Sequence, residues 1–284
     1  MSAWLPAAPC TPATCVEPSR GAVAAPRAVL RLAAVAFLLL AAVAVVLTPV
    51  RRRVPAAVVA RWSRWVVRAA GVRVRVTGAP APAGGLLLVA NHVSWLDIPL
   101  LAAVRPARML AKSEIRHWPV AGALAARGGV LFIERDRLRA LPDTVAALAL
   151  ALRAGAAVAA FPEGSTWCGR AHGAYRRAVF QAALDAGVPV QPVRLRYRAG
   201  ERELSTAPAF VGADTLLASV WRVASSRGLT AEVEVCPVVP AGRHPDRRSL
   251  AEAAEAAEAD RRMSPPAHPH GHQRKAPSKS MCVL

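Results

Sequence analysis

Residues 86–97 read LLLVANHVSWLD, a short apolar run followed directly by polar side chains. The run over 86–90 contains no polar residue and has the length of a strand that is buried on both faces. Asn91, His92 and Asp97 follow at the point where the chain leaves this strand. In covered sheets, functional groups gather beyond the carboxyl ends of the strands. The stretch therefore predicts a buried strand with a candidate site at its end.

His92 and Asp97 can approach each other in only one local geometry. Five positions on a regular helix turn a side chain by about 140°, so the two residues would diverge if both were helical. They meet if His92 lies in the loop and Asp97 lies near the start of a helix. A carboxylate placed there orients the imidazole, which could then take a proton from an alcohol. No G-x-S-x-G motif accompanies the pair.

Apolar strands and helical stretches alternate on both sides of this segment, which predicts an α/β domain over residues 72–245. Strands are expected over 72–76 (alternating and half-buried), 86–90, 130–133, 156–161, 190–197 and 231–239. Helices are expected over 97–103, 120–126, 142–153 and 174–186.

A second polar group, Phe161-Pro-Glu-Gly-Ser-Thr166, also follows an apolar strand. Gly164, Ser165 and Thr166 offer backbone and hydroxyl donors at a turn, which suits an anion. Glu163 could bind a substrate hydroxyl. The alternative is a plain strand-to-helix turn with a capping Ser or Thr.

A third group consists of Lys112, Glu114 and, just after the strand over 130–133, Arg135. A guanidinium at a strand end can grip a phosphate with two parallel hydrogen bonds. A surface arginine without a ligand is the alternative in a chain with so many arginines.

Residues 32–50 contain no charged side chain and are long enough for a transmembrane or membrane-embedded helix. The N-terminal tail, residues 1–31, is longer than a cleaved signal peptide requires before its apolar region. Eight arginines and no acidic residue lie between positions 51 and 75, which predicts that the C-terminal side is cytoplasmic. The tail would then face outward, or the helix enters only one leaflet.

Residues 51–71 carry a pattern that also indicates contact with the membrane. Val58, Trp62, Trp65 and Val66 fall on one helical face, and arginines fall on another. This pattern is typical of a basic amphipathic helix in the headgroup region. An ordinary surface helix that packs on the domain is the alternative.

The net charge of +19 suits either nucleic acid or an anionic membrane surface. No helix-turn-helix, zinc-finger or RNA-binding pattern is present, so nucleic acid is not an expected partner. Five cysteines without a C-x-x-C pair argue against a disulfide framework or a thiolate zinc site, and no metal is expected. Residues 246–284 are expected to form a helix followed by a disordered basic tail.

Taken together, these blocks resemble the lysophospholipid and glycerol-phosphate acyltransferase family, in particular the 1-acylglycerol-3-phosphate acyltransferases. The first block matches N-H-x4-D, the second K-x-E with G-x-x-F-I-x-R, the third F-P-E-G-S and the fourth V-P-V-x-P-V. They occupy Asn91 to Asp97, Lys112 to Arg135, Phe161 to Thr166 and Val188 to Val193.

The resemblance implies a mixed sheet flanked by helices and an O-acyltransferase of phospholipid biosynthesis at the plasma membrane. His92 would be the general base and Asp97 would orient it. Arg135, Glu163 and Gly164 would hold the acceptor, with Lys112, Ser165 and Thr166 nearby. The acceptor would be lysophosphatidic acid in the bilayer, and the donor acyl-CoA or acyl carrier protein, with no resident cofactor.

Alternatives to this activity stay open. The acceptor could be glycerol 3-phosphate or a lyso-ornithine lipid. The chain could also be a non-catalytic relative that binds membrane lipid.

Overall fold

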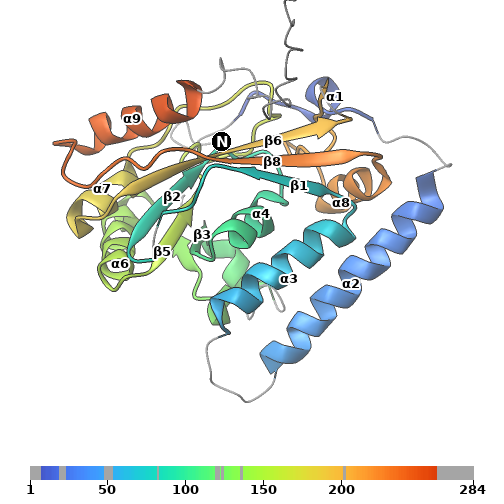
Figure 1. Ribbon diagram of the computed structural model, residues 1–284, viewed down its shortest axis with the longest axis horizontal. Coiled ribbons are helices and arrows are strands. Elements are labelled where there is room, and N and C mark those ends of the chain that lie inside the picture. Colours follow the sequence, from blue (N-terminus) through green and yellow to red (C-terminus); the bar gives the residue numbers. More distant parts are fainter. Residues whose placement is uncertain are drawn as a thin grey trace, which may run out of the picture.

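The computed structural model describes residues 8–18, 24–47, 54–81, 83–118, 122, 125–134, 137–200 and 203–260. Within these ranges the predicted α/β architecture is confirmed: a mixed sheet lies between two groups of helices (Figure 1). The expected disordered tail lies outside the described residues.

The strands form one sheet in the order β1-β8-β6-β2-β5-β3-β4, with β7 paired to β6. Strands β2, β5, β3 and β4 run parallel, so their carboxyl ends share one edge. Strand β6 is parallel to β2 and antiparallel to β8 and β7. The strands are β1 (Arg73–Thr77), β2 (Leu86–Ala90), β3 (Arg108–Lys112), β4 (Leu131–Ile133), β5 (Ala157–Ala160), β6 (Val190–Ala199), β7 (Glu203–Leu204) and β8 (Leu229–Val235).

Helices cover both faces of the sheet, with α3, α4 and α8 on one side and α6, α7 and α9 on the other (Figure 1). The helices are α1 (Pro12–Cys15), α2 (Ala25–Leu47), α3 (Ala56–Ala69), α4 (Asp97–Val104), α6 (Leu141–Arg153), α7 (Ala178–Ala186), α8 (Leu216–Ser225) and α9 (Arg247–Asp260). Short 3-10 turns occupy Ser113–His117 and Leu138–Ala140.

Strand β2 explains why the sequence is continuously apolar over 86–90. Leu86, Leu88 and Ala90 point into the core beneath α3 and α4. Leu87 and Val89 point into the opposite core, beneath α6 and α7. All five residues are buried, so each must be apolar, and the predicted buried strand is confirmed.

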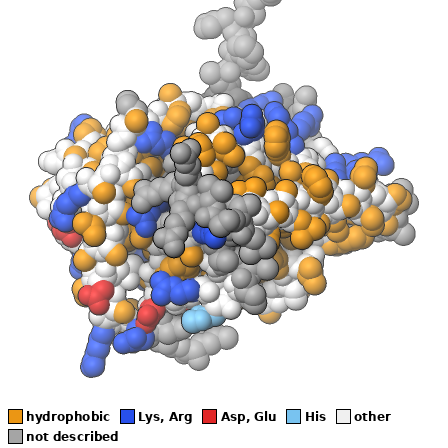
Figure 2. Space-filling model, turned by 90° about the horizontal axis from the view of Figure 1, so that it is seen from below, with side chains coloured by type: hydrophobic (Ala, Val, Ile, Leu, Met, Phe, Trp, Pro, Cys, Tyr) orange, Lys and Arg blue, Asp and Glu red, His pale blue; other side chains and the backbone are white. Residues whose placement is uncertain are grey.

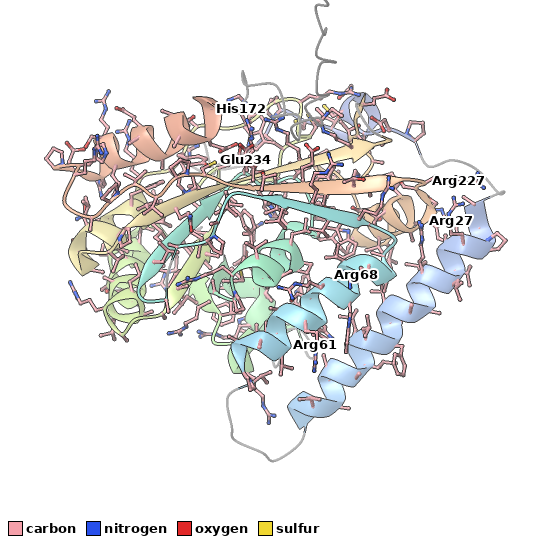
Figure 3. All side chains as sticks on the ribbon, viewed as in Figure 1. Arg27, Arg61, Arg68, His172, Arg227 and Glu234 are labelled. Carbon is pink, nitrogen blue, oxygen red and sulfur yellow. The ribbon has the colours of Figure 1, made fainter. Side chains whose placement is uncertain are left out.

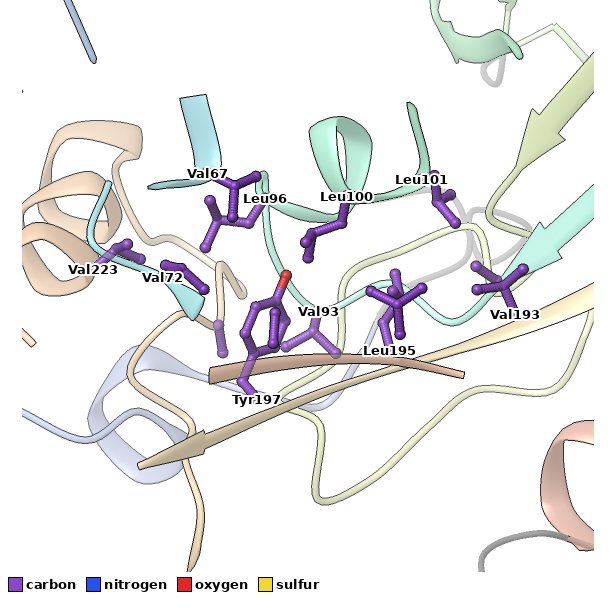
Figure 4. Close-up of a cluster of buried hydrophobic side chains, with 14 of the residues drawn as sticks. Val67, Val72, Val93, Leu96, Leu100, Leu101, Val193, Leu195, Tyr197 and Val223 are labelled. Carbon is purple, nitrogen blue, oxygen red and sulfur yellow. The ribbon is translucent and has the colours of Figure 1, made fainter. Parts of the chain in front are cut away.

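Tyr197 of β6 brings one polar atom into the first core. Its ring packs among Val72, Val93 and Leu100, and its hydroxyl points toward the start of α4 (Figure 4). The side chain is almost completely buried, so the hydroxyl needs a partner inside the protein. That partner belongs to the candidate site.

The structure differs from the strand predictions at β1 and β3, and it adds the two-residue strand β7, which was not predicted. Strand β1 was expected to be half-buried, but all five residues are exposed. It is the end strand of the sheet, and its side chains on both faces are open to solvent. Strand β3 was not predicted because its five residues include Arg108 and Lys112 and carry no apolar alternation. The predicted helix over 120–126 lies partly outside the described residues.

Helix α2 begins at Ala25, earlier than the predicted start at residue 32, and residues 48–50 lie outside the described part. Arg27 and Arg31 extend it because their guanidinium groups donate to the carbonyl oxygens of Ser225, Ala224 and Ser226 at the end of α8. Cations are favoured at a helix C-terminus. Figure 3 labels Arg27 on α2 and Arg227 in the turn that follows α8.

Within the described residues, one helix is long and apolar enough to cross a membrane, Ala25–Val45, with a mean hydropathy of 2.6. Only 11% of its most apolar window is buried inside the protein, so it is no ordinary core helix. Figure 2 shows hydrophobic side chains gathered along this projecting arm. Its exposed large side chains are Val29, Leu30, Phe37, Leu39, Leu40 and Val45.

Helix α3 runs back beside α2 and packs on the domain through Ala60, Ser63, Val66 and Val67. The Trp62 indole donates to the Leu38 carbonyl, 3.2 Å away, which ties the two helices together. Val58 and Trp65 stay exposed. Arg61 and Arg68 project from the same helix (Figure 3).

Candidate active site

His92 and Asp97 come together in the geometry that the sequence predicts. His92 lies in the loop after β2, and Asp97 is the first residue of α4. Nδ1 of His92 lies 2.8 Å from Oδ2 of Asp97. A carboxylate accepts hydrogen bonds and does not donate them, so Nδ1 carries a proton and Nε2 of the neutral ring is left as the acceptor.

Asp97 is completely buried and is held by further donors. Its Oδ2 also accepts the backbone N–H groups of Val93 and Ser94, at 2.7 and 2.8 Å. Its Oδ1 accepts the Tyr197 hydroxyl at 2.5 Å. Burial and the neighbouring Asp97 charge raise the pKa of Tyr197 well above its usual range, so the phenol stays a donor. A buried carboxylate with this many donors is fixed in place and compensated for its lost hydration.

The His92 ring is fixed from a second side. It stacks on Phe161, with ring centroids 4.0 Å apart and planes inclined by 11°. The backbone carbonyl of His92 accepts the N–H of Trp167 at 2.8 Å. About 20% of the His92 side chain remains exposed, so a substrate can reach the ring.

Glu163 connects the two loops. Its Oε2 accepts the His92 backbone N–H at 2.7 Å, and its Oε1 accepts the Gly173 N–H at 3.1 Å. The side chain is 3% exposed, and burial raises its pKa to about 8, against the lowering effect of these two bonds. Glu163 therefore positions the loop that carries His92, which the sequence did not predict. Contact between Glu163 and an acceptor stays a prediction.

The turn after Glu163 has the shape that the sequence suggests. Gly164 has φ +74°, a left-handed conformation that favours glycine, and its N–H donates to Phe161. Ser165 follows in a partly buried position. The Thr166 hydroxyl donates to the Phe210 carbonyl. Contact between Thr166 and an acceptor stays a prediction.

The remaining predicted binding residues are located only in part. Lys112 is exposed at the end of β3, on the same sheet edge as His92 and Glu163 because these strands are parallel. Arg135 lies outside the described residues.

A pocket of about 500 Å³ opens beside Glu163. Its lining residues are Glu163, Trp167, Gly173, Ala174, Tyr175, Arg176 and Arg177. The Trp167 indole N–H is buried against Gly173 and has no partner among the described residues. The two arginines make the pocket suitable for an anionic group.

Sequence reasoning missed Tyr197, Arg176 and Arg177. Tyr197 lies 100 positions from Asp97, and only the pairing of β6 with β2 brings them together. A tyrosine at a buried position of a strand was the one available signal. Asn91 was part of the motif without a stated role. Its side chain exchanges hydrogen bonds with the backbone of Leu195, at 2.7 and 3.0 Å, and so joins the site loop to β6.

Comparison with known proteins agrees with this geometry. The acyltransferase family model matches residues 73–196, which contain the His92–Asp97 pair and the Glu163 turn. The chain belongs to this family and is an O-acyltransferase of lipid metabolism.

Two curated relatives carry different substrate names. The 1-acyl-sn-glycerol-3-phosphate acyltransferase of Neisseria gonorrhoeae is 39% identical over 182 residues, which cover 63% of this chain and 70% of the relative. The lyso-ornithine lipid O-acyltransferase of Pseudomonas aeruginosa is 38% identical over 215 residues, which cover 74% and 78%.

A solved structure shares the fold. The 1-acyl-sn-glycerophosphate (LPA) acyltransferase PlsC from Thermotoga maritima superposes with a TM-score of 0.59. The match covers 85% of this chain and 98% of that one, at 18% sequence identity.

Proposed function

We propose that the protein transfers a fatty acyl group from a thioester to the free hydroxyl of lysophosphatidic acid and so forms phosphatidic acid. The observation that carries this proposal is the fixed imidazole of His92, with Nδ1 donating to buried Asp97 beside a pocket lined by arginines.

His92 acts as the general base in this scheme. Its Nε2 takes the proton of the acceptor hydroxyl as the oxygen attacks the thioester carbonyl. A C–O bond forms and the C–S bond breaks. The thiolate that leaves takes the proton back from Nε2, so the ring returns to its starting state. Asp97 stabilises the imidazolium between these two steps, and no acyl-enzyme forms.

The acceptor phosphate binds at the edge where β2, β5, β3 and β4 end. Lys112, Arg135, Gly164 and Ser165 are the binding residues that we propose from the family motifs. Arg176 and Arg177 add two cations at the neighbouring pocket. With its pKa near 8, Glu163 is largely protonated at neutral pH, so it does not repel a phosphate there.

The proposed donor is acyl-CoA or acyl carrier protein. Both present the acyl chain as a thioester on an anionic carrier, which suits a strongly basic protein. Proton transfer between the acceptor, His92 and the thiolate balances without a resident cofactor or metal.

A lyso-ornithine lipid is the second candidate acceptor, because the match to the relative of that name covers more of this chain than the match to the 1-acyl-sn-glycerol-3-phosphate acyltransferase. Arginines around the pocket favour phosphate, since an ornithine headgroup carries an amine as well as a carboxylate.

We propose that α2 and α3 form a helical hairpin in the membrane. Helices α2 and α3 enter the cytoplasmic leaflet of the plasma membrane and leave it on the same side. Support comes from Glu17, which precedes α2 and accepts hydrogen bonds from Thr206 and Ser205 of the catalytic domain. Both ends of the hairpin thus adjoin one domain, and the N-terminal segment need not cross the bilayer.

An acceptor panel tests the proposed substrate. Purified full-length protein in mixed micelles receives labelled acyl-CoA or acyl carrier protein with lysophosphatidic acid, glycerol 3-phosphate or lyso-ornithine lipid, each separately. We expect phosphatidic acid as the main product. Acylation of lyso-ornithine lipid alone would favour the second candidate, and no transfer to any acceptor would contradict the proposal.

A further inference from the structure

Three cysteines that are scattered in the sequence converge beside the catalytic loops. Cys10 precedes α1 in the N-terminal segment, Cys15 is the last residue of α1, and Cys168 follows the turn after β5. The three sulfur atoms all lie within 4.8 Å of one another. Cys10 and Cys168 are buried at 5% and 4% exposure, while Cys15 is partly open to solvent.

Contacts other than the cysteines hold the N-terminal segment in this place. Glu17 accepts the Thr206 N–H at 3.1 Å and the Ser205 hydroxyl at 3.0 Å, and it pairs with Arg170 at 3.4 Å. Thr11 caps α1 by accepting the Thr14 N–H. The cluster is therefore built into a packed interface between the segment and the domain.

We propose that Cys10, Cys15 and Cys168 bind one thiophilic d¹⁰ cation, with Zn²⁺ as the reference ion. A zinc–sulfur bond of about 2.3 Å places two sulfurs on one tetrahedral ion about 3.8 Å apart. The observed spread requires only small side-chain movements to reach that value. The partly exposed side of Cys15 leaves the fourth position to a solvent molecule.

A bound ion fits three converging sulfurs better than a disulfide does. A disulfide joins two sulfurs at about 2.05 Å and leaves the third without a role. On an ion, all three thiols lose their protons and become ligands. The absence of a C-x-x-C pair had argued against such a site, but the third ligand comes from a loop more than 150 positions away.

The proposed ion would couple the N-terminal segment to the site. Cys168 follows Trp167, whose N–H donates to the His92 carbonyl. An ion on Cys168 therefore anchors the loop that helps to fix His92. This inference does not depend on the identity of the acceptor, because metal binding is measured without substrate.

Cobalt(II) is the probe that tests this site. The reduced full-length protein carries Cys236→Ser and Cys282→Ser, so that only the three clustered thiols remain. We expect one Co²⁺ per chain, with thiolate-to-cobalt charge-transfer absorption and the intense visible bands of tetrahedral coordination, both abolished by excess Zn²⁺. Adding Cys10→Ser or Cys168→Ser should remove the charge-transfer band.

A protection experiment on the wild-type chain keeps the test independent of the variants' folding. We expect Zn²⁺ to slow alkylation of Cys15, the partly exposed thiol, by a maleimide at least about tenfold, as for a thiolate that is more than about 90% metal-bound, while alkylation of Cys236 is unchanged. Failure to bind Co²⁺, binding that survives Cys10→Ser and Cys168→Ser, or equal alkylation with and without Zn²⁺ would overturn the proposal.

Discussion

Nδ1 of His92 and Oδ2 of Asp97 lie 2.8 Å apart, although five residues separate them in the chain. The chain turns between them so that the Val93 and Ser94 N–H groups donate to the same Asp97 oxygen. The carboxylate also begins α4, where negative charge is stabilised by the helix dipole. One side chain thus places negative charge at a helix start, closes a loop and orients the imidazole.

Asp97→Asn should lower kcat by about 10²–10⁴-fold, by analogy with the carboxylate of a catalytic triad. An amide places an N–H₂ group where either the backbone donors or the Tyr197 hydroxyl now bind. Turnover and the thermal midpoint should be measured on the same preparation. Near-normal turnover in a folded variant would contradict the proposed orienting role.

Tyr197→Phe should remove one donor from Asp97 without touching the substrate. We expect kcat to fall by about 3- to 30-fold with an unchanged KM, and stability to fall by about 1–3 kcal/mol because a buried carboxylate loses a bond. The kcat–pH profile should shift as well. An unchanged pH profile with only lower stability would indicate a purely structural role.

The raised pKa of Glu163 should make the stability of the protein depend on pH. Its folded pKa of about 8 lies above the ordinary value of 4.5, so between these values the folded state binds the proton more tightly. The stabilising contribution of protonated Glu163 is complete below about pH 4.5 and is lost as the pH rises through about 8. Over this range the free energy of unfolding falls by up to about 1.4 kcal/mol per pH unit.

Glu163→Gln is the matched variant, because it cannot ionise. Unfolding should be followed from pH 5 to pH 9 in the wild type and the variant. The decline in stability toward pH 8 should be shallower in Glu163→Gln. Parallel curves for the two proteins would show that Glu163 does not titrate in this range.

Removing both pocket arginines, Arg176→Ala with Arg177→Ala, should raise the acceptor KM by about tenfold or more and change kcat less. Each arginine contributes charge to a region where we place the acceptor phosphate. Arg248→Ala is the control, since Arg248 pairs with Glu252 on the surface of α9. An equal acceptor KM in the wild type, the double variant and Arg248→Ala would show that the pocket does not bind the acceptor.

Charged residues on α2 should weaken membrane binding. We expect Phe37→Glu with Leu40→Glu to move the protein from the vesicle-bound to the free fraction in a flotation assay. Both side chains are about two-thirds exposed on the projecting arm. Leu150→Glu on α6 is the control, because Leu150 is equally exposed but lies away from the hairpin. An equal loss of vesicle binding in the α2 double variant and in Leu150→Glu would contradict insertion of α2.

Local patterns predicted the central part of this molecule. The apolar run of β2 and the His92–Asp97 spacing each depend on residues that are close in the chain, so their geometry follows from strand and helix periodicity. The start of α2 was placed too late because Arg27 and Arg31 were read as the border of an apolar segment. Their partners, the terminal carbonyls of α8, are distant in sequence.

Contacts between segments that are distant in the chain could not be predicted from the sequence. Tyr197 meets Asp97 only because β6 pairs with β2, and Cys168 meets Cys10 only because the N-terminal segment packs on the domain. Neither contact has a local periodicity. The exposure of β1 likewise depends on its place at the end of the sheet, which alternation alone does not reveal.

The most direct test of the account compares acyl transfer by the wild type, His92→Ala and His117→Ala in the same lipid micelles. His117 is exposed in the 3-10 turn after β3 and has no assigned role. We predict that His92→Ala lowers kcat by orders of magnitude while the fold and acceptor binding persist, and that His117→Ala retains activity. Near-wild-type turnover by a folded His92→Ala protein would contradict the assignment of His92 as the base.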